Sequence, residues 1–504
     1  MKVAFRVDAS SQIGTGHFMR CLTLADALKR GGAQIRFVSR HMPEHLGRML
    51  VAQEHEFIPI KSSPSNLSSD GLSNAHWLGT NQHADAKDTI QALSDQTWDW
   101  LVVDHYALDT RWESLLRKTV NKVLVIDDIA DRQHDCDVLL DQNLSADMET
   151  RYTGIVPMNC GLLLGPRYAL LREEFRRLHK HVTPRNGLVN RVLVFFGGVD
   201  ADNFTGRTIE ALSNLSIEGL RVDVVIGVQH PQREQIESAC AKCDFVCHVQ
   251  TSRMAELMAS ADLAVGAGGS ASWERCCLGL PVLAFATANN QRPLVEEAAL
   301  RGLLYAPLSR PDIASSMELH FRALIDNPRL LQLISRRGLE AVDGLGVRRV
   351  LREIGCSLIV IREATQADSE NLLMWRNHWS VRAVSRNANL IDKTTHEAWL
   401  KGVLSNPDRV LLIGECQGKA IGVARFDMCA DEAEVSVYLV PDHQGEGLGS
   451  ELLLAAEQWL DEHRPAVLSI KAEVLENNEP SHRLFRACGY QMRSSLYAKD
   501  FHRI

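Results

Sequence analysis

The sequence lacks several features that mark other classes of protein. No apolar run reaches the roughly 20 residues that a membrane-spanning helix needs. Lysine and arginine form no long run, and a net charge of -8 gives no general reason to expect nucleic acid or a membrane surface as a partner. The 12 cysteines are scattered, without matched partners at zinc-site spacing. They predict reduced thiols in a cytoplasmic protein that holds no metal.

We expect no leader segment, and low-complexity sequence is also missing. The first residues resemble a weak signal peptide, but Arg6 and Asp8 interrupt the apolar stretch. We therefore interpret Val3–Val7 as a first β-strand. The sequence contains no internal repeat, and the Ser-rich segment Lys61–Ser73 has the composition of a loop.

What is present is a long alternation of apolar runs and helical stretches. A chain of 504 residues is too long for a single hydrophobic core, and about three folding units are expected. Over the first 340 or so residues, strand–helix alternation predicts parallel sheets covered by helices on both faces. The predicted strands of the first series are Val3–Val7, Gln34–Ser39, Trp100–Asp104, Val123–Asp127 and Val138–Asp141. Those of the second series are Val192–Phe196, Arg221–Ile226, Asp244–His248, Leu263–Gly266 and Val282–Phe285.

The basic stretch Arg176–Arg191 separates the two series, and the character of the sequence changes again near Gly344–Ser357. The last part predicts antiparallel strands joined by short turns, followed by a helix from Gly449 to Leu460, another strand and a last helix. The prediction is an α/β fold in which two Rossmann-like domains, residues 1–175 and 176–345, face a cleft and precede an α+β domain at 358–504. Ligands of the parallel sheets are expected at the carboxyl ends of the strands.

The strongest local signal lies in the C-terminal part. The alternating strand Val435–Val440 leads into a turn, Gln444–Ser450, with glycine at 445, 447 and 449, and this turn opens a helix with an apolar face. Glycine lets a backbone approach a ligand closely, and free N–H groups at a helix start bind phosphate oxygens. An ordinary strand–loop–helix connection remains the alternative.

This Gln-x-x-Gly-x-Gly pattern, with Asn477–Phe485 and Cys488–Tyr490 after it, resembles the signature of the GNAT acetyltransferases. The resemblance covers residues 358–504 and implies acetyl-CoA as the coenzyme. It implies coenzyme contacts from Leu439, Val440, Gln444, Gly445, Gly447, Gly449, Ser450 and Asn478.

Acetyl transfer needs a neutral amine and a proton for the leaving thiolate. Glu434 lies at the start of the strand expected to bind the coenzyme and is the candidate base. The alternative is that Glu434 is a solvated residue at a strand end. Many family members carry a tyrosine acid on the last helix, but the matching residue here is Phe485. Tyr490, Tyr438 or water then remains as the acid.

Trp375-Arg376-Asn377 resembles a stretch of GNAT enzymes that act on amino sugars and on ribosomal-protein N-termini. Trp375 is predicted to stack on an apolar face of the acceptor, and Arg376 to meet a phosphate. A tryptophan in the core and an arginine on the surface are the alternative.

The second strong signal opens the chain. After the first strand, Gly14 and Gly16 shape a tight loop and a helix is expected to start at His17. The positive end of the helix dipole disfavours an imidazolium, so a neutral imidazole suited to general-base work is expected. A helix-capping or structural histidine is the alternative.

A similar loop follows a strand of the second series. Residues 266–274 contain Gly268, Gly269 and Ser270 at a helix start, where bare N–H groups neutralise a diphosphate without a metal. Glu274, one turn on, is expected to accept both ribose hydroxyls, although an acid is favourable in any first helical turn. Further expected contacts at this edge are Gly198, Asn290 and Gln291.

Two glycine loops on two parallel-sheet domains resemble the GT-B architecture of UDP-sugar glycosyltransferases. The segments that carry a closer resemblance are 8–17, 104–106, 126–128, 168–175 and 266–274. They resemble the UDP-sugar hydrolase of the pseudaminic acid pathway, which cleaves UDP-2,4-diacetamido-2,4,6-trideoxy-β-L-altropyranose. The resemblance covers about residues 1–310.

That family implies that His17 deprotonates a water, which attacks the anomeric carbon with inversion while UDP leaves. Asp104, Tyr106 and Asn143 are then expected near the sugar or the water, or else as strand-end residues that hold the sheet. Asp127 and Asp128 are interpreted as structural or orienting. The substrates are a UDP-sugar and acetyl-CoA.

The fusion suggests that the GNAT part acetylates the 4-amino precursor of the hydrolase substrate. A glycosyltransferase remains the alternative for the first part. For the second part, the alternatives are a protein or small-amine N-acetyltransferase and a non-catalytic acetyl-CoA-binding module.

Overall fold

The computed structural model describes residues 1–10, 12–60, 71–215, 217–307, 313–441, 443, 447–493 and 496–500. The chain forms two compact units, Met1–Val350 and Leu351–Ile504. The division falls inside the segment 344–357, where the sequence changes character.

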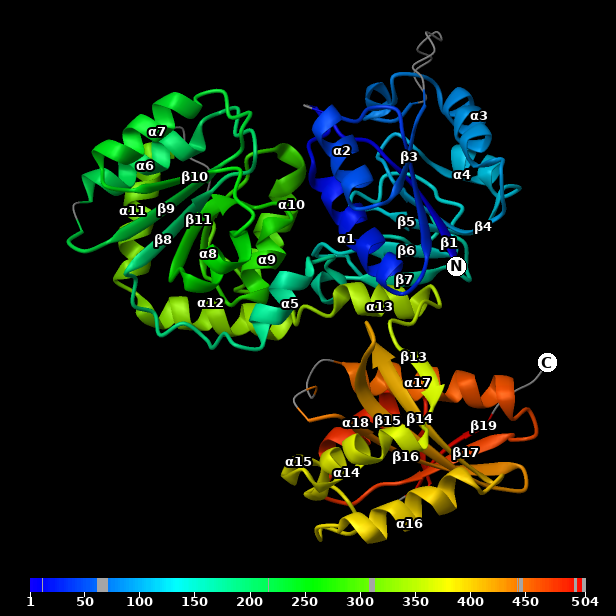
Figure 1. The fold of residues 1–504 in the computed structure, drawn as a ribbon. Coiled ribbons are helices and arrows are strands. Elements are labelled where there is room, and N and C mark those ends of the chain that lie inside the picture. Colours follow the sequence, from blue (N-terminus) through cyan, green and yellow to red (C-terminus); the bar gives the residue numbers. More distant parts are fainter. Residues whose placement is uncertain are drawn as a thin grey trace. The chain divides into compact units, whose positions relative to one another are not determined.

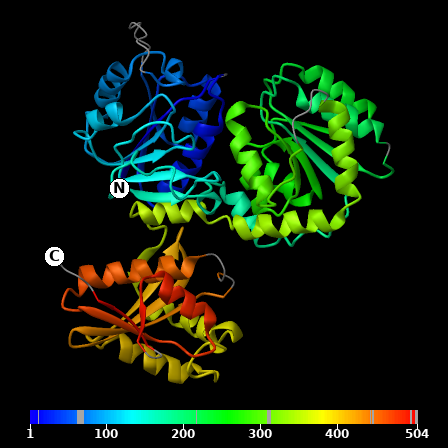
Figure 2. The same cartoon turned by 180° about the vertical axis from the view of Figure 1, so that it is seen from behind.

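The first sheet of the N-terminal unit is parallel throughout, in the order β3-β2-β1-β4-β5-β6-β7. Its strands are β1 (Lys2–Val7), β2 (Gln34–Ser39), β3 (Glu56–Pro59), β4 (Trp98–Asp104), β5 (Val120–Ile126), β6 (Val138–Asp141) and β7 (Gly161–Leu164). The intervening helices are α1 (Gly16–Arg30), α2 (Glu44–Ala52), η1 (Ala75–Leu78), α3 (Gln82–Leu93), α4 (Thr110–Leu116) and η2 (Pro166–Tyr168). Figures 1 and 2 show helices on both sides of this sheet, drawn in blue to cyan.

Apolar side chains fill the space between this sheet and its helices. On one face, Trp112 of α4 and Leu93 of α3 pack with the sheet residue Leu101. Elsewhere in this unit Phe18 of α1 packs on Phe37, whose ring stacks on Phe5 at 4.8 Å between centroids. Buried strands with both faces covered explain the near-continuous apolar runs in the sequence.

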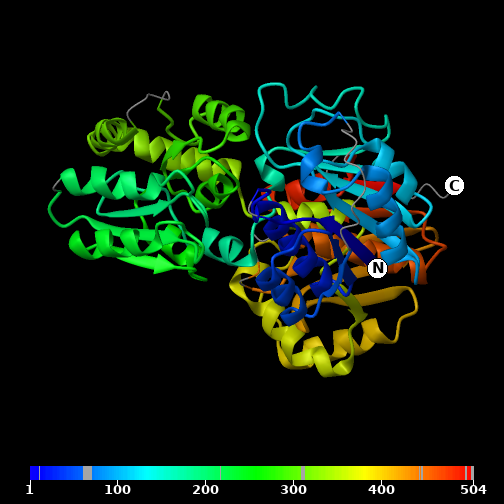
Figure 3. The same ribbon diagram turned by 90° about the horizontal axis from the view of Figure 1, so that it is seen from above.

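The second sheet is also parallel, in the order β10-β9-β8-β11-β12. Its strands are β8 (Arg191–Phe195), β9 (Arg221–Ile226), β10 (Val246–Val249), β11 (Leu263–Ala267) and β12 (Val282–Phe285). The helices are α5 (Glu173–His179), α6 (Phe204–Asn214), α7 (Arg233–Lys242), α8 (Met254–Ser260), α9 (Ala271–Cys277), η3 (Asn289–Gln291), α10 (Arg292–Leu300), α11 (Ile313–Ile325), α12 (Pro328–Ala341) and α13 (Gly346–Glu353). Figure 3 shows the green strands enclosed by helices.

One hydrophobic cluster joins the two sheets of the N-terminal unit. Leu144, Leu171 and Phe175 come from the end of the first series and pack with Trp273 and Met258 of the second. The predicted boundary at residue 175 therefore falls inside α5, whose side chains belong to this shared cluster.

The order of both sheets is the doubly wound one. In each sheet the chain moves outward from its first strand in one direction and then returns to the other side, so that β1 lies beside β4 and β8 beside β11. This point of reversal is where ligands bind in open α/β sheets. Two such domains in sequence confirm the predicted fold class for this part of the chain.

The C-terminal unit has a mixed sheet in the order β13-β14-β15-β16-β17-β19-β18. Its strands are β13 (Val360–Glu363), β14 (Arg409–Cys416), β15 (Lys419–Cys429), β16 (Glu432–Leu439), β17 (Ser469–Glu473), β18 (Gln491–Arg493) and β19 (Leu496–Asp500). The helices are η4 (Gln366–Asp368), α14 (Ser369–Asn377), α15 (Trp379–Arg382), α16 (Lys393–Leu404), α17 (Leu448–His463) and α18 (Glu479–Ala487). Helices α17 and α18 pack on one face of the sheet, and α14 and α16 pack on the other.

The predicted α+β domain is confirmed, and the differences lie at its edges. The terminal strands β18 and β19 form a hairpin after the last predicted helix. In the first sheet of the N-terminal unit, strands β3 and β7 were also not predicted, because short edge strands carry little apolar pattern.

Among the described residues, the structure contains no helix that is both long and apolar enough to cross a membrane.

Candidate active sites

His17 lies at the reversal point of the first sheet. It occupies the first turn of α1, directly after β1, and Asp104 is the last residue of the neighbouring strand β4. The Nδ1 atom of His17 lies 2.6 Å from Oδ1 of Asp104. Arg20, one turn further along α1, donates from Nε to Asp104 Oδ2 at 2.6 Å and from Nη2 to Oδ1 at 2.7 Å.

These contacts decide the tautomer of His17. Arg20 Nη2 also lies 3.1 Å from His17 Nδ1, but a guanidinium only donates. His17 Nδ1 and Arg20 Nη2 therefore share Asp104 as their acceptor, so Nδ1 carries a proton. Nε2 makes no hydrogen bond with the described residues, and the side chain is 10% exposed. A neutral His17 thus presents a free acceptor nitrogen.

Asp104 contacts His17 and Arg20 within the protein, which agrees with the strand-end alternative to a sugar or water contact. Its side chain is fully buried and both oxygens are engaged. Burial opposes its ionisation, but the charge of Arg20 and the hydrogen bonds from Arg20 and His17 hold its pKa well below the usual range. The ionised carboxylate fixes the ring of His17.

An aromatic wall flanks the imidazole. The Tyr106 ring meets the His17 ring edge to face at 4.6 Å between centroids, and Trp77 stacks on Tyr106 at 5.5 Å. The Tyr106 hydroxyl donates to Asp128. Burial and the Asp128 charge raise the pKa of Tyr106. Tyr106 is thus beside His17 as predicted, whereas Trp77 was missed because its segment has no recognisable motif.

Asp127 and Asp128 point in different directions, as adjacent strand-end residues should. Asp127 is fully buried and pairs with Arg132 at 2.9 Å, which fits the structural role that was predicted. Asp128 instead accepts from Arg20 at 2.9 Å and from Asn143 at 3.0 Å. Asp128 therefore belongs to the hydrogen-bonded network around His17.

Both polar atoms of the Asn143 side chain are engaged inside the protein. Its Nδ2 donates to Asp128, and its Oδ1 accepts from the indole of Trp273 at 2.9 Å. The structure thus makes Asn143 a link between the two sheets. Glu274 follows Trp273 on α9, and its carboxylate lies 3.5 Å from Nη2 of Arg172. Burial raises the pKa of Glu274.

The glycine loop after β11 lies at the reversal point of the second sheet. A Cβ on Gly268 would lie 2.0 Å from the side chain of Val295, so only glycine fits there. A Cβ on Gly269 would lie 3.6 Å from Nε2 of Gln291, which places that amide beside the loop. Ser270 precedes α9 and caps it with no side-chain hydrogen bond.

The remaining predicted contacts lie on loops of the same unit. Gly198 follows β8, and its carbonyl is so close to Gly227 that a Cβ there would lie 2.2 Å away. Gly14 has φ +79°, which favours glycine, and its N–H donates to Ser10 at 2.8 Å. Gly16 begins α1. Asn290 lies in η3, and its side chain is outside the described part.

In the C-terminal unit, strands β16 and β17 separate at Glu434. They pair only at Glu432–Ser469, Ala433–Ile470 and Glu434–Lys471, although β16 continues to Leu439. Beyond Glu434 the β16 backbone therefore has an edge that is unpaired within the part of the chain that the structure describes. Glu434 itself accepts from Arg386 Nη2 at 2.8 Å, and the same nitrogen lies 2.5 Å from Glu473.

The two predicted backbone contacts on this strand differ. The Val440 N–H donates to Ile421 at 3.0 Å and its carbonyl accepts from His443 at 3.2 Å, so both groups are already engaged. Alternation along a strand puts the Leu439 backbone on the opposite edge. Leu439 is thus compatible with coenzyme binding, whereas the backbone groups of Val440 already have partners, and both contacts stay predictions.

The turn before α17 is described in part. Gly447 has φ +72° and precedes the helix, and Gly449 and Ser450 form its first turn. Gln444 and Gly445 lie outside the described residues. Asn478 accepts from the Ser481 N–H at 3.2 Å and caps α18, and its predicted coenzyme contact stays a prediction.

Tyr490 and Tyr438 were the side-chain candidates for the acid in place of Phe485. Phe485 is buried and packs edge to face on Tyr490 at 5.0 Å. The Tyr490 hydroxyl donates to Glu457 at 2.7 Å, and burial together with the Glu457 charge raises its pKa. Tyr438 makes no hydrogen bond with the described residues, and burial raises its pKa as well. Tyr438 therefore stays a candidate, and Tyr490 does not.

Trp375 lies in the core, which agrees with the alternative to the stacking role predicted for it. It is 7% exposed and packs with Leu372, Leu400 and Leu411. Its neighbour Arg376 projects differently, and its Nη2 donates to the Asn387 carbonyl at 2.6 Å.

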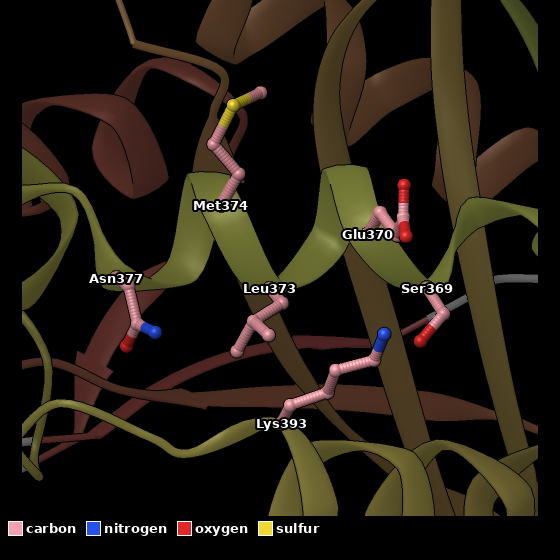
Figure 4. Close-up of a pocket in the computed structure, with 6 residues that line it drawn as sticks. All are labelled: Ser369, Glu370, Leu373, Met374, Asn377 and Lys393. Atoms are coloured by element: carbon pink, nitrogen blue, oxygen red, sulfur yellow. The ribbon is translucent and has the colours of Figure 1, made fainter.

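A cavity of about 260 Å³ lies beside α14 and is lined by Ser369, Glu370, Leu373, Met374, Asn377 and Lys393. The Lys393 side chain extends toward the start of the helix, where Ser369 and Glu370 lie (Figure 4). None of the residues predicted as a site lines this cavity. Within the described residues, no group of three or more His, Cys, Asp or Glu side chains is arranged to hold a metal ion.

Comparison with known proteins agrees with this division of the chain. Residues 373–490 match the model of the Acetyltransferase (GNAT) family. The uncharacterized protein MJ1062 of Methanocaldococcus jannaschii is 22% identical over 504 residues, covering 97% of both chains. UDP-2,4-diacetamido-2,4,6-trideoxy-beta-L-altropyranose hydrolase of Campylobacter jejuni is 28% identical over 218 residues, covering 43% of this chain and 68% of that protein. Acinetobacter baumannii MurG has a crystal structure with TM-score 0.49 and 13% identity, covering 70% of this chain and 98% of that one.

These findings define the class of the protein. The C-terminal unit is a GNAT acetyltransferase domain. It follows a two-sheet region related in sequence to an enzyme that acts on a sugar nucleotide.

Proposed function

We propose that the chain is a bifunctional nucleotide-sugar enzyme of pseudaminic acid biosynthesis. Its N-terminal unit hydrolyses UDP-2,4-diacetamido-2,4,6-trideoxy-β-L-altropyranose to the free sugar and UDP, with inversion. Its C-terminal unit transfers an acetyl group from acetyl-CoA to the 4-amino precursor. The observation that carries the first half is the oriented His17 at the reversal point of the first sheet.

In the hydrolytic step His17 acts as the general base. With its Nδ1 proton held by Asp104, Nε2 accepts a proton from water as the oxygen attacks the anomeric carbon. The bond between that carbon and the diphosphate oxygen breaks, and UDP leaves with both bonding electrons. The Asp104 carboxylate stabilises the imidazolium that forms, as an acid partner does for the histidine of a catalytic triad.

The leaving diphosphate is assigned to the glycine loop of the second sheet. The N–H groups of Gly269 and Ser270 make no hydrogen bond with described residues, and Gln291 Nε2 lies beside Gly269. Backbone donors at such a loop neutralise phosphate oxygens. Glu274, set one turn further on, is assigned to the ribose hydroxyls.

The acetyl-transfer step is assigned to the opening between β16 and β17. The unpaired edge at Leu439 holds the pantetheine arm, and the turn at Gly447 receives the diphosphate of acetyl-CoA. Glu434 lies where the strands part and takes the amine proton, directly or through water. The amine nitrogen then forms a bond to the acetyl carbon as the bond to sulfur breaks, and Tyr438 or water protonates the thiolate.

The two activities follow one another in chemical logic. The hydrolase substrate carries an acetamido group at C4, and the acetyltransferase makes that group from an amine. Similarity to MJ1062 over 97% of both chains supports treating the two parts as one working unit.

The first test is to supply acetyl-CoA and the 4-amino UDP-sugar together and to identify the products by mass spectrometry. The wild-type chain is expected to yield free diacetamido sugar, UDP and CoA. His17→Ala is expected to accumulate the acetylated UDP-sugar, with UDP release slowed about 10²- to 10⁴-fold because the general base is lost.

His45→Ala is the matched control, since His45 is an exposed histidine of the same sheet's helices. It should leave both activities unchanged. UDP release that persists at the wild-type rate in His17→Ala would overturn the hydrolytic half. Release that appears only when a hydroxylated acceptor is added would identify a glycosyltransferase instead.

A further inference from the structure

Arg376 and Arg382 of the C-terminal unit have no acidic partner among the residues that the structure describes. Arg376 of α14 donates to the carbonyl of Asn387 at 2.6 Å, and Arg382 of α15 donates to the carbonyl of Ala388 at 3.1 Å. Nη1 of Arg376 and Nε of Arg382 are buried without a hydrogen-bond partner. Neither guanidinium forms an ion pair with any residue that the structure describes.

The pair lies close together, since the accepting carbonyls belong to consecutive residues. The charge of Arg382 acts on Arg376, and burial with this repulsion lowers the pKa of Arg376. A half-buried cation without a counter-charge is costly, and two side by side cost more. Such an arrangement is stabilised when an anion binds between the two guanidinium groups.

The segment 386–388 connects this pair to the site of acetyl transfer. Arg386 contacts Glu434, the candidate base, while the next two residues hold Arg376 and Arg382. Tyr438 of β16 contributes to the electrostatic environment of Arg376. The segment that holds the arginine pair therefore also contacts Glu434, the candidate base for the amine.

The pair lies on the acceptor side of the sheet. Tyr438 and Val440 pack toward α14 and α16, whereas Val437 and Leu439 pack toward α17. The diphosphate of the coenzyme is assigned to the turn before α17, on the opposite face. An anion bound by Arg376 and Arg382 is thus part of the second substrate.

An exposed indole completes this surface. Trp379 is 70% exposed and lies on α15 three positions before Arg382, so the two side chains share one face of the helix. A flat aromatic surface beside paired guanidinium groups suits a base attached to a diphosphate.

We propose that Arg376 and Arg382 form the phosphate subsite of the acetyl acceptor, with Trp379 as the surface for its base. Resting on the proposed acetylation of a nucleotide-linked amino sugar, this inference states which residues select that class of acceptor. Phosphate oxygens replace the Asn387 and Ala388 carbonyls as acceptors of the two guanidinium groups, whose planar forks match phosphate geometry.

The test compares two acceptors in the full-length chain: the UDP-linked 4-amino sugar and the same amino sugar without UDP. Thiol release from acetyl-CoA gives kcat/KM for each. The wild-type chain should favour the UDP-linked amine. Arg376→Gln and Arg382→Gln should each lower kcat/KM for that acceptor about 10- to 100-fold, as expected for a charge-assisted hydrogen bond. The variants should leave the free amine and the KM for acetyl-CoA unchanged.

Arg409→Gln is the matched control, because it also removes one positive charge from this unit. Arg409 is already paired with Asp427 at 3.1 Å, so its loss should leave the preference intact. Arg376→Lys should restore part of the preference, since it keeps the charge but not the fork. Unchanged binding of acetyl-CoA confirms that each variant is folded.

The outcomes separate this inference from the proposed function. Equal kcat/KM for the two amines in the wild-type chain overturns the phosphate subsite and leaves acetyl transfer standing. A raised KM for acetyl-CoA in the double variant also overturns it and assigns the pair to the coenzyme. Failure to acetylate any amine while UDP-sugar is still hydrolysed overturns the proposed acetyltransferase, and the subsite with it.

Discussion

Arg20 is buried and Arg376 is half-buried, and their surroundings differ in charge. Arg20 pairs with Asp104 at 2.6 Å and with Asp128 at 2.9 Å, and both carboxylates are buried with it. Arg376 is bonded to a carbonyl and faces a second arginine. The first guanidinium is neutralised within the protein, whereas the second has no counter-charge among the described residues and, in our proposal, receives one from the acetyl acceptor.

The difference teaches how a charged side chain in a site can be interpreted. A buried arginine with two carboxylates is costly to disturb, and it holds its neighbours in place. Here that neighbour is His17, whose tautomer must be set before any substrate arrives. An arginine without a counter-charge is instead available for recognition. The predictions that follow test this contrast, beginning with the largest effect.

Asp104→Asn should disrupt the contacts that neutralise Arg20 and orient His17. An amide cannot offer two acceptor oxygens to Arg20 and His17 together, so the imidazole loses its fixed tautomer. UDP release is expected to slow about 10²- to 10⁴-fold. Thermal unfolding should also begin earlier, because Arg20 keeps only Asp128 as a partner. Acetylation of the 4-amino UDP-sugar, measured by thiol release in the same sample, is expected to stay at the wild-type rate.

Both activities falling together in Asp104→Asn would indicate a purely structural role for the carboxylate. Asp104→Glu is a useful companion, since it keeps the charge but moves it. We expect it to recover stability before it recovers hydrolysis.

Ala388→Asp should give Arg376 and Arg382 a carboxylate partner, as Arg20 already has. Ala388 is exposed, and its carbonyl accepts from Arg382 at 3.1 Å. A carboxylate there supplies the missing counter-charge, so the KM for the UDP-linked amine should rise about tenfold. The midpoint of thermal unfolding should stay the same or rise slightly. Ala388→Asn is the uncharged control, and an equal rise in KM for both variants would contradict an electrostatic cause.

Asp141 is the acidic counterpart of Arg376, because it is a buried carboxyl whose neighbours include charges of its own sign. The effect expected from changing it is smaller. Burial first, and then the charge of Asp128, raise the pKa of Asp141 to about 7. Its neighbour Tyr152 donates to it at 3.0 Å. Between the ordinary carboxyl pKa and about 7, the folded state holds a proton that the unfolded chain has lost. This group's contribution to stability is therefore present at low pH and is lost as pH rises through that window.

Asp141→Asn removes this titration while keeping a neutral side chain of the same shape. We expect the variant to be more stable than the wild-type chain at pH 8 relative to pH 5, by about 2–4 kcal/mol at most. Thermal unfolding at the two pH values measures the difference. A pH dependence identical to that of the wild-type chain would show that Asp141 is ionised in the folded protein.

Much of the fold followed from local pattern. Apolar runs between helical stretches identified most strands of both parallel sheets, and their bounds in the structure differ from the predicted ones by a few residues. The exceptions were β3, β7 and the hairpin of β18 and β19. These lie at or near sheet edges, where few side chains are buried on both faces and the apolar pattern is weak.

The candidate sites were predictable where a glycine loop or a helix start marks them. His17, Tyr106, Gly268 and Gly269 lie at the reversal points as their positions after strands indicated. Arg20 was missed, although its spacing of three residues from His17 puts it on the same face of α1. Trp375 and Asn143 have partners inside the protein, as the structural alternatives for them predicted, and Asn478 caps a helix. Their roles as ligand contacts stay predictions.

The sequence by itself determined the order of the elements, the two glycine loops and the GNAT domain, since each depends on residues close together in the chain. Only the tertiary structure decided which charges are neutralised. Asp104 reaches His17 across 87 positions, while no carboxylate in the described part of the chain pairs with Arg376. Ion pairs of this kind depend on how strands and helices far apart in sequence are brought together. Patterns over a few neighbouring residues do not predict such contacts.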